Sequence, residues 1–377
     1  MPPFISPGSR RWLAGVVSLL LPVVAVLCWR AGPSDTAPAP ALAAATTAAD
    51  AEDLRHLQRD RTVNADGMRM SFLPVRSIKP QVPGLLRLGV LEPATVPVAD
   101  VVFLHGHADR LDNHMALFKA WAGGGVRVIA LAWPSHGLSD VGPLDIYTED
   151  ELIALVRQVE IATLQDRMRP LVLAGWSYGG LLATRLAQRR AALHSLSRPP
   201  AGLLLAPGVV LQPFVGGDGI ARVETLQHAP YPLLAASPSP ASPLMNPVFA
   251  LRTLALAWQA QHARLPQDLP VQVVVADDKS DWYVSTGGIK AWAGQQQQQG
   301  VPLQLLQCAG ARHGLDNESW PLGARVRSLS LAFVQQVARA LPPNGRRSAS
   351  PLQDPALQRA CQVVAAPPAS AAEPHLP

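Results

Sequence analysis

The chain has 377 residues, of which 48% are apolar and only 16% charged. This composition supports a large buried core and excludes a chain that is disordered throughout. The net charge of +5 comes from 32 basic and 27 acidic residues that are scattered along the sequence. So mild and dispersed a charge argues against nucleic acid as a partner.

The three cysteines are Cys28, Cys308 and Cys361. They form no closely spaced pairs, so the sequence predicts neither a zinc knuckle nor a framework of several disulfides. Cys28 lies within an apolar run, which leaves a Cys308–Cys361 bridge as the one disulfide that could form. The spacing does not require that bridge.

The first segment with a clear pattern is an apolar run at 12–29, preceded by Arg10 and Arg11. A helix of these 18 residues would be long enough to cross a membrane, since about 20 apolar residues span the hydrocarbon core. The two arginines would keep the amino end inside. We expect 1–51 to be a membrane anchor plus an Ala/Pro-rich linker. A cleaved signal, with the Ala-Leu-Ala at 41–43 as its cleavage site, is the alternative, and in both cases the rest of the chain is exported.

The middle of the chain alternates short apolar runs with segments of helical periodicity. This pattern predicts an α/β domain over 52–341, with a mainly parallel sheet covered by helices on both faces. Two segments, 62–73 and 85–91, look like an antiparallel hairpin at one edge. The runs expected to form the parallel strands are 101–104, 126–132, 170–174, 202–206, 271–276 and 303–306.

Two further regions break the alternation. Residues 209–266 are rich in proline and glycine, which predicts a lid-like insertion over one edge of the sheet. Residues 342–377 are rich in proline, alanine and serine, and we expect them to form a flexible, disordered tail.

The strongest chemical signal is the segment Leu171-Val-Leu-Ala-Gly-Trp-Ser177-Tyr-Gly-Gly-Leu181. Here a short strand leads into Gly-x-Ser-x-Gly, and a helix follows. A serine on such a sharp strand-to-helix turn projects its hydroxyl at the carboxyl edge of the sheet. It also lies at a helix amino terminus, which favours developing negative charge. We therefore expect Ser177 to be a nucleophile rather than part of a plain glycine-rich turn.

A nucleophilic serine needs a histidine base and a carboxylate that orients it. Of the ten histidines, only His313 lies in a glycine-rich turn after the last strand, so it is the expected base. The acid should come from the loop after 271–276. Asp281 is favoured there, ahead of Asp278 and then Asp277. Five other histidines are interpreted as surface or helix residues: His114, His136, His194, His228 and His262.

Acyl transfer also requires donors for a tetrahedral oxyanion. The first is expected to be the backbone N–H of Tyr178, directly after the nucleophile. The second is expected from the loop after 101–104, where Gly106 lets the chain turn and the N–H of His107 follows. His105 and His107 could alternatively form a metal pair, but no third ligand has suitable spacing. The sequence therefore predicts neither a metal site nor a cofactor.

These motifs, taken together, resemble the α/β-hydrolase superfamily. Within it, the chain is similar to the serine aminopeptidase-like group, which includes monoacylglycerol lipases and lysophospholipases. The resemblance covers about 85–320 and departs from the family at Trp176, where many relatives have histidine. The matching stretches are 105–107, 125–131, 134–140, 175–180, 281–284 and 310–314.

The resemblance implies an α/β-hydrolase fold and a serine hydrolase that cleaves carboxylic esters through an acyl-enzyme. A small acyl ester or a lipid, such as a lysolipid, is the expected substrate. Two alternatives stay open: an aminopeptidase or amidase of the same fold, and a catalytically silent binding module.

Overall fold

The computed structural model describes the central part of the chain. The residues described are 62–63, 66–82, 84–107, 109–137, 139, 141–205, 247–281, 283–340 and 361–364. The predicted span at 12–29 and its linker lie outside them, as do 209–246 of the predicted insertion and most of the predicted tail. Across the described part, no helix combines the length and the apolar character that crossing a membrane requires.

The described strands form one sheet of ten, in the order β1-β2-β3-β5-β4-β6-β7-β8-β9-β10. Strands β5, β4, β6, β7, β8 and β9 run parallel, whereas β1, β2 and β3 are antiparallel at one edge and β10 is antiparallel at the other. The parallel strands and the hairpin edge lie where the sequence pattern placed them. The strands are β1 (Thr62–Val63), β2 (Arg69–Pro74), β3 (Leu85–Leu91), β4 (Ala99–Leu104), β5 (Val126–Leu131), β6 (Leu171–Gly175), β7 (Pro200–Leu205), β8 (Val271–Val275), β9 (Leu303–Cys308) and β10 (Cys361–Val363).

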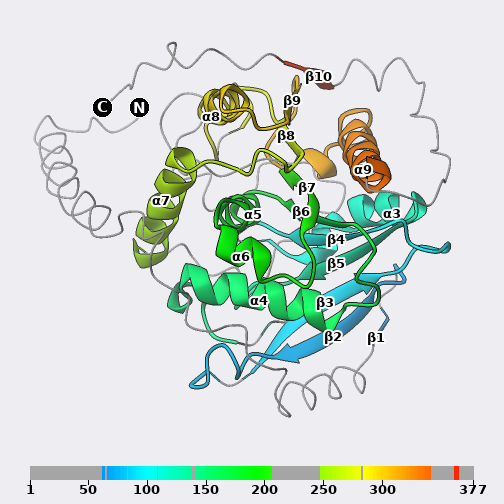
Figure 1. The fold of residues 1–377 in the computed structure, drawn as a ribbon, viewed down its shortest axis with the longest axis vertical. Coiled ribbons are helices and arrows are strands. Elements are labelled where there is room, and N and C mark those ends of the chain that lie inside the picture. Colours follow the sequence, from blue (N-terminus) through cyan, green and yellow to red (C-terminus); the bar gives the residue numbers. More distant parts are fainter. Residues whose placement is uncertain are drawn as a thin grey trace, which may run out of the picture.

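Helices cover both faces of this sheet (Figure 1). Successive residues of a strand point to opposite faces, so Val102 and Leu104 join one buried cluster while Val101 and Phe103 join the other. Burial on both sides explains why the strands are continuous apolar runs. The helices of the first face are α4 (Glu149–Ala162), α5 (Tyr178–Gln188), α6 (Arg190–His194), α7 (Pro247–His262) and α8 (Thr286–Gln298), and those of the second are α3 (Met115–Gly123) and α9 (Leu322–Ala340).

The carboxyl end of the predicted insertion differs from the expectation. Residues of α7 lie within 209–266, yet Phe249, Ala257 and Ala260 are buried in the cluster that covers the first face of the sheet. The helix packs against α5. This part of the segment therefore belongs to the framework of the domain.

The predicted tail also differs, at residues 361–364. Strand β10 pairs antiparallel with β9, with Cys361 opposite Cys308, and a disulfide joins these two cysteines. The expectation of a tail without structure is wrong for this short strand, because a partner 53 residues away in sequence holds it. Three short 3-10 helices complete the described elements: η1 (Leu111–His114), η2 (Leu144–Ile146) and η4 (Leu315–Asn317).

Candidate active site

The candidate nucleophile occupies a sharp turn between β6 and α5. Ser177 has φ 54° and ψ −123°, a positive φ that is uncommon for a residue with a side chain. A hydrogen bond ties the turn to the end of β4, where the N–H of Trp176 donates to the carbonyl of Leu104 at 3.0 Å. The half-buried Ser177 side chain therefore projects at the carboxyl edge of the sheet, as expected from Gly-x-Ser-x-Gly.

The two glycines of this motif are required by close backbone packing. A Cβ atom on Gly175 would lie 2.4 Å from the carbonyl oxygen of Gly179, and one on Gly179 would lie 2.0 Å from that of Leu104. Both distances are far inside van der Waals contact. The spacing of the motif thus follows from how tightly β4, β6 and α5 approach one another.

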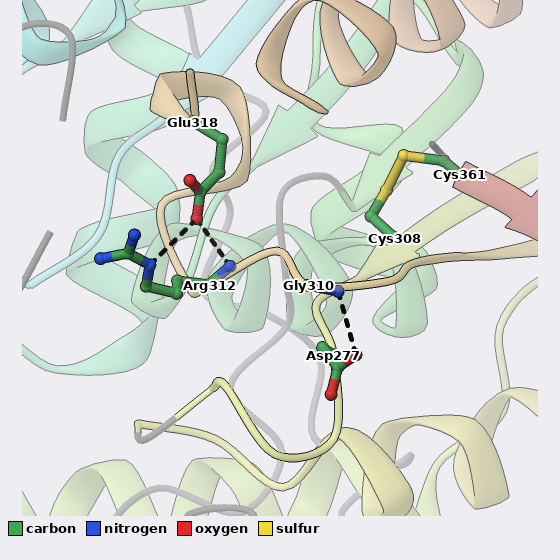
Figure 2. Close-up of a disulfide and its surroundings, with 6 residues drawn as sticks. All are labelled: Asp277, Cys308, Gly310, Arg312, Glu318 and Cys361. Carbon is green, nitrogen blue, oxygen red and sulfur yellow. Dashed lines mark hydrogen bonds and ion pairs between the residues drawn. A yellow bond between two sulfur atoms is a disulfide. The ribbon is translucent and has the colours of Figure 1, made fainter. Parts of the chain in front are cut away.

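The loop that contains His313 is tied down on both sides of this residue. Before it, the carboxylate of Asp277 accepts a hydrogen bond from the N–H of Gly310 at 3.0 Å. After it, the carboxylate of Glu318 accepts one from the N–H of Arg312 at 2.7 Å and pairs with the Arg312 side chain (Figure 2). The disulfide lies at the end of β9, where the same loop begins (Figure 2).

The three expected triad residues meet at the carboxyl edge of the sheet. The Nε2 atom of His313 lies 2.9 Å from the hydroxyl of Ser177, and its Nδ1 atom lies 3.0 Å from Oδ2 of Asp281. Asp281 is 2% exposed and His313 4%. The second oxygen of Asp281 accepts the N–H groups of Tyr283 and Val284 at 3.0 and 3.2 Å, so both carboxylate oxygens are fixed.

The two alternative acids have other partners. Asp278 accepts hydrogen bonds from Thr286 and Lys290, both at 2.6 Å. Although partial burial opposes it, these bonds lower the pKa of Asp278. Asp277 holds the turn at Gly310. The structure therefore brings only Asp281 of the three to His313.

The predicted oxyanion donors lie beside the nucleophile. Tyr178 is the first residue of α5, a position whose N–H has no partner within the helix. A Cβ atom on Gly106 would lie 2.9 Å from that of Ser177, so the loop that leads to His107 passes directly against the nucleophile. Two elements, α5 and the loop at Gly106, therefore lie against Ser177.

His105 holds the start of this loop. Its Nδ1 atom bonds the carbonyl of Gly106 at 2.7 Å, and its Nε2 atom accepts the N–H of Trp133 at 3.1 Å. These partners fix a neutral ring, and burial lowers the pKa of His105 to about 3. Both ring nitrogens are thus engaged within the protein. Over the described residues, no group of three or more His, Cys, Asp or Glu is arranged to hold a metal ion.

A group of aromatic rings, which the sequence did not predict and which we call the aromatic wall, packs around the side chains of His107 and Tyr178. The ring of Phe249, near the start of α7, stacks on His107 at 4.5 Å and contacts Tyr178 at 5.1 Å between ring centroids. The ring of Tyr283 contacts that of His313 at 5.1 Å between centroids. These rings place aromatic surface against His107, Tyr178 and His313.

The expectation that His114 and His136 are surface or helix residues is wrong in one respect, since both are buried, with exposures of 1% and 0%. His114 lies between the carboxylates of Asp109 and Asp316. Asp316 lies only three residues after His313 in the sequence, yet its carboxylate contacts His114 rather than His313. The long-range contact with His114 could not be read from local patterns.

Several solved structures share this fold. A carboxyl esterase from Bacillus coagulans has 14% identity, with 71% of this chain and 99% of that chain covered and a TM-score of 0.52. An epoxide hydrolase from Vigna radiata has 14% identity, coverages of 72% and 99%, and a TM-score of 0.51. A monoglyceride lipase from Saccharomyces cerevisiae has 13% identity, coverages of 67% and 92%, and a TM-score of 0.50. At identities this low, the structural likeness shows a common fold and nothing more.

Comparisons of the sequence with known proteins gave one informative result. A comparison with curated proteins found no match. The model of a family described as "Alpha/beta hydrolase family" matches residues 101–293, which is more than half of the chain and includes Ser177 and Asp281. The fold, the strand order and this match agree, and the chain belongs to the alpha/beta hydrolase family.

Proposed function

We propose that this chain is a serine hydrolase that cleaves carboxylic esters through an acyl-enzyme. The observation that carries the proposal is the hydrogen-bonded series from Ser177 through His313 to Asp281, with contacts of 2.9 and 3.0 Å. A hydroxyl is a weak nucleophile on its own, and a base oriented by a buried carboxylate is the arrangement that activates it.

In the acylation step, the Ser177 hydroxyl attacks the ester carbonyl while Nε2 of His313 takes its proton. Asp281 holds the Nδ1–H of the ring, which keeps the lone pair of Nε2 directed at the serine. The N–H groups of His107 and Tyr178 donate to the oxyanion of the tetrahedral intermediate. The intermediate collapses as His313 returns the proton to the departing alkoxide, so the alcohol leaves and the acyl group stays on Ser177.

Deacylation repeats the sequence with water as the nucleophile. His313 takes a proton from the water as it attacks the acyl carbonyl, and the same two N–H groups stabilise the second oxyanion. Collapse releases the carboxylic acid and returns the proton to Ser177. Neither half of the cycle calls for a metal or a cofactor.

The aromatic wall supports an apolar acyl chain as the preferred substrate. The rings of His107, Phe249 and Tyr178 pack together and belong to or contact the two residues whose N–H groups would bind the ester carbonyl. Burial lowers the pKa of His107 to about 3, so its ring is neutral and does not repel an apolar group. A medium-chain ester or a lysolipid fits this surface. The yeast monoglyceride lipase and the Bacillus carboxyl esterase are named for substrates of the same class.

Export of the domain is part of the same proposal. The apolar run at 12–29 predicts an anchor or a signal, and the Cys308–Cys361 disulfide is the kind of bond that persists in oxidising compartments. Attachment to a membrane would bring the site close to lipid substrates.

Hydrolysis of a series of p-nitrophenyl esters, from acetate to laurate, tests the proposal. We expect turnover that is lost in Ser177→Ala and that is highest for an intermediate chain length. A leucine p-nitroanilide serves as the peptidase control. Faster turnover of the anilide than of every ester would favour the aminopeptidase alternative, and equal rates for the protein and Ser177→Ala would favour a silent module.

A further inference from the structure

A second group of buried ionisable side chains lies behind the triad. The ring of His114 is held between two carboxylates, with Nε2 at 2.6 Å from Asp109 and Nδ1 at 2.7 Å from Asp316. All three side chains are buried, at 1%, 5% and 0% exposure respectively for His114, Asp109 and Asp316. We call this group the His114 bridge. It takes no part in the steps proposed above.

The geometry requires a positively charged ring. Both ring nitrogens face carboxylate oxygens, so each nitrogen must donate, and only the imidazolium has two N–H groups. Burial by itself would lower the pKa of His114, but the charges of Asp316 and Asp109 outweigh it and raise the pKa to about 10. Other titratable groups near the bridge are His105 and His136, whose pKa values are both lowered by burial, and Arg327, which donates to the carbonyl of Asp316.

The bridge joins the two loops that carry the proposed catalytic groups. Asp109 follows His107 by two residues, so it belongs to the loop of the second oxyanion donor. Asp316 follows His313 by three residues, so it belongs to the loop of the base. His114 contacts both carboxylates at once and thereby fixes the distance between one loop and the other.

Trp176 provides a second path from the bridge to the base. Its ring contacts the ring of His114 at 5.3 Å and that of His313 at 5.1 Å between centroids. Its indole N–H donates to the backbone carbonyl of His313 at 2.9 Å. A displacement of His114 would therefore be transmitted to His313 through Trp176 as well as through Asp316.

Stability alone is a weak reason for such a group. Replacing a buried ionic cluster by apolar residues of similar volume is often neutral or stabilising, because the desolvation of the charges is costly. What the two hydrogen bonds of His114 do provide is one defined geometry, since both ring nitrogens must align with a carboxylate oxygen. Catalysis requires the oxyanion donor and the base to be placed within fractions of an ångström, and a fixed geometry of this kind would keep them there.

We propose that His114 is a positioning residue, which holds the N–H of His107 and the imidazole of His313 in the relative geometry that ester cleavage needs. This inference rests on the proposed hydrolase function. It makes His114 a group that acts through Asp109, Asp316 and Trp176 and never touches the substrate.

The test compares His114→Gln with a matched control, Asp100→Asn. Asp100 is also fully buried and ion-paired, with Arg169 at 2.9 Å and with Arg198, but it lies near the amino end of β4, away from the site. For each protein we would measure kcat and KM with p-nitrophenyl butyrate, Tm, and the NMR resonance of the Trp176 indole N–H, assigned with Trp176→Phe. Active sites are counted by exhaustive fluorophosphonate labelling.

We expect His114→Gln to lower kcat per active site by about 10- to 100-fold, the order that a misplacement of about 1 Å costs. KM should stay within about twofold, because the substrate surface is untouched, and the indole resonance should shift. Asp100→Asn should lower Tm yet leave kcat per site and the indole resonance unchanged. Equal kcat values per site in the two variants, with an unshifted indole in His114→Gln, would overturn the proposal.

Asp316 provides a second comparison if His114→Gln does not fold. Asp316→Asn keeps an oxygen that can accept from Nδ1 of His114, whereas Asp316→Ala does not. Positioning through this bond predicts at least about fivefold higher kcat per site for Asn than for Ala, and equal values would contradict it. Failure of the hydrolase proposal itself can be told apart from failure of this inference. In that case the unmodified protein would turn over no ester, but the indole resonance would still report whether His114 holds the His313 loop.

Discussion

The indole N–H of Trp176 donates to the backbone carbonyl of His313 at 2.9 Å. The residue directly before the proposed nucleophile thus holds the loop of the proposed base, which lies 137 positions further along the chain. Many members of the family that the sequence resembles have histidine at this position. In this chain, a larger ring both packs against the imidazole and bonds to its backbone.

Trp176→Phe removes this hydrogen bond and keeps most of the apolar ring. We expect kcat for p-nitrophenyl butyrate to fall about 3- to 10-fold, because a lost hydrogen bond is worth about 1 kcal/mol and the His313 loop keeps its other tethers. KM should change little. Steady-state kinetics with the two proteins at matched active-site concentration measures the effect, and an unchanged kcat would show that the bond does not position His313.

Asp281→Asn and Asp278→Asn separate the proposed triad acid from its neighbour. Asp281→Asn should lower kcat by about 10⁴-fold. The amide would stabilise the wrong tautomer of His313, and it would not stabilise the imidazolium that forms during the reaction. Asp278→Asn, which removes an ion pair with Lys290, should leave kcat within about twofold, as expected for a half-exposed pair. If Asp278→Asn were the more damaging of the two, the assignment of the acid would be wrong.

Stability should have a maximum near neutral pH, because the pKa values of three histidines shift in opposite directions: those of His105 and His107 fall, and that of His114 rises. Burial lowers the pKa of His105 and His107 from 6.5 to about 3, so their contribution is present above 6.5 and is lost as the pH falls toward 3. The pKa of His114 is raised to about 10, so its contribution is full below 6.5 and is lost as the pH rises through 10.

Thermal unfolding followed by circular dichroism from about pH 4 to about pH 10 checks this expectation. In His114→Gln the loss of Tm on the alkaline side should be smaller than in the unmodified protein, while the acid side should keep its slope. Identical alkaline slopes in the two proteins would contradict a charged His114.

The Cys308–Cys361 disulfide should contribute substantially to stability. It closes a loop with a sequence separation of 53 residues, for which chain entropy predicts about 4 kcal/mol. Cys361→Ala should therefore lower the free energy of unfolding in guanidinium chloride by up to that amount. The unfolded, unreduced protein should react with a thiol reagent at Cys28 alone, and three reactive thiols per chain would show that the bond does not form.

Much of the fold follows from local sequence. The parallel strands are short apolar runs because both faces of the sheet are covered, and Gly-x-Ser-x-Gly marks the turn at Ser177 because two backbone contacts exclude any Cβ atom. His313 could be chosen from its glycine-flanked turn after the last parallel strand. Asp281, the favoured acid, is the one that the structure brings to His313.

The rest depends on contacts that no local pattern encodes. Strand β10 forms through pairing with β9 and a disulfide to it, in a segment whose composition is that of a disordered tail. The buried state of His114 depends on Asp316, which lies 202 positions away. The packing of α7 on α5 hides Phe249 in a region that looks like a lid by its prolines alone.

Covalent labelling of Ser177 tests the central claim most directly. The protein would be treated with a fluorophosphonate, digested with trypsin and analysed by mass spectrometry, beside Ser177→Ala and His313→Ala. We predict one adduct per chain, located on the tryptic peptide 168–185 at Ser177, with none in Ser177→Ala and much slower labelling in His313→Ala. An unlabelled protein, or an adduct that persists in Ser177→Ala, would contradict the account.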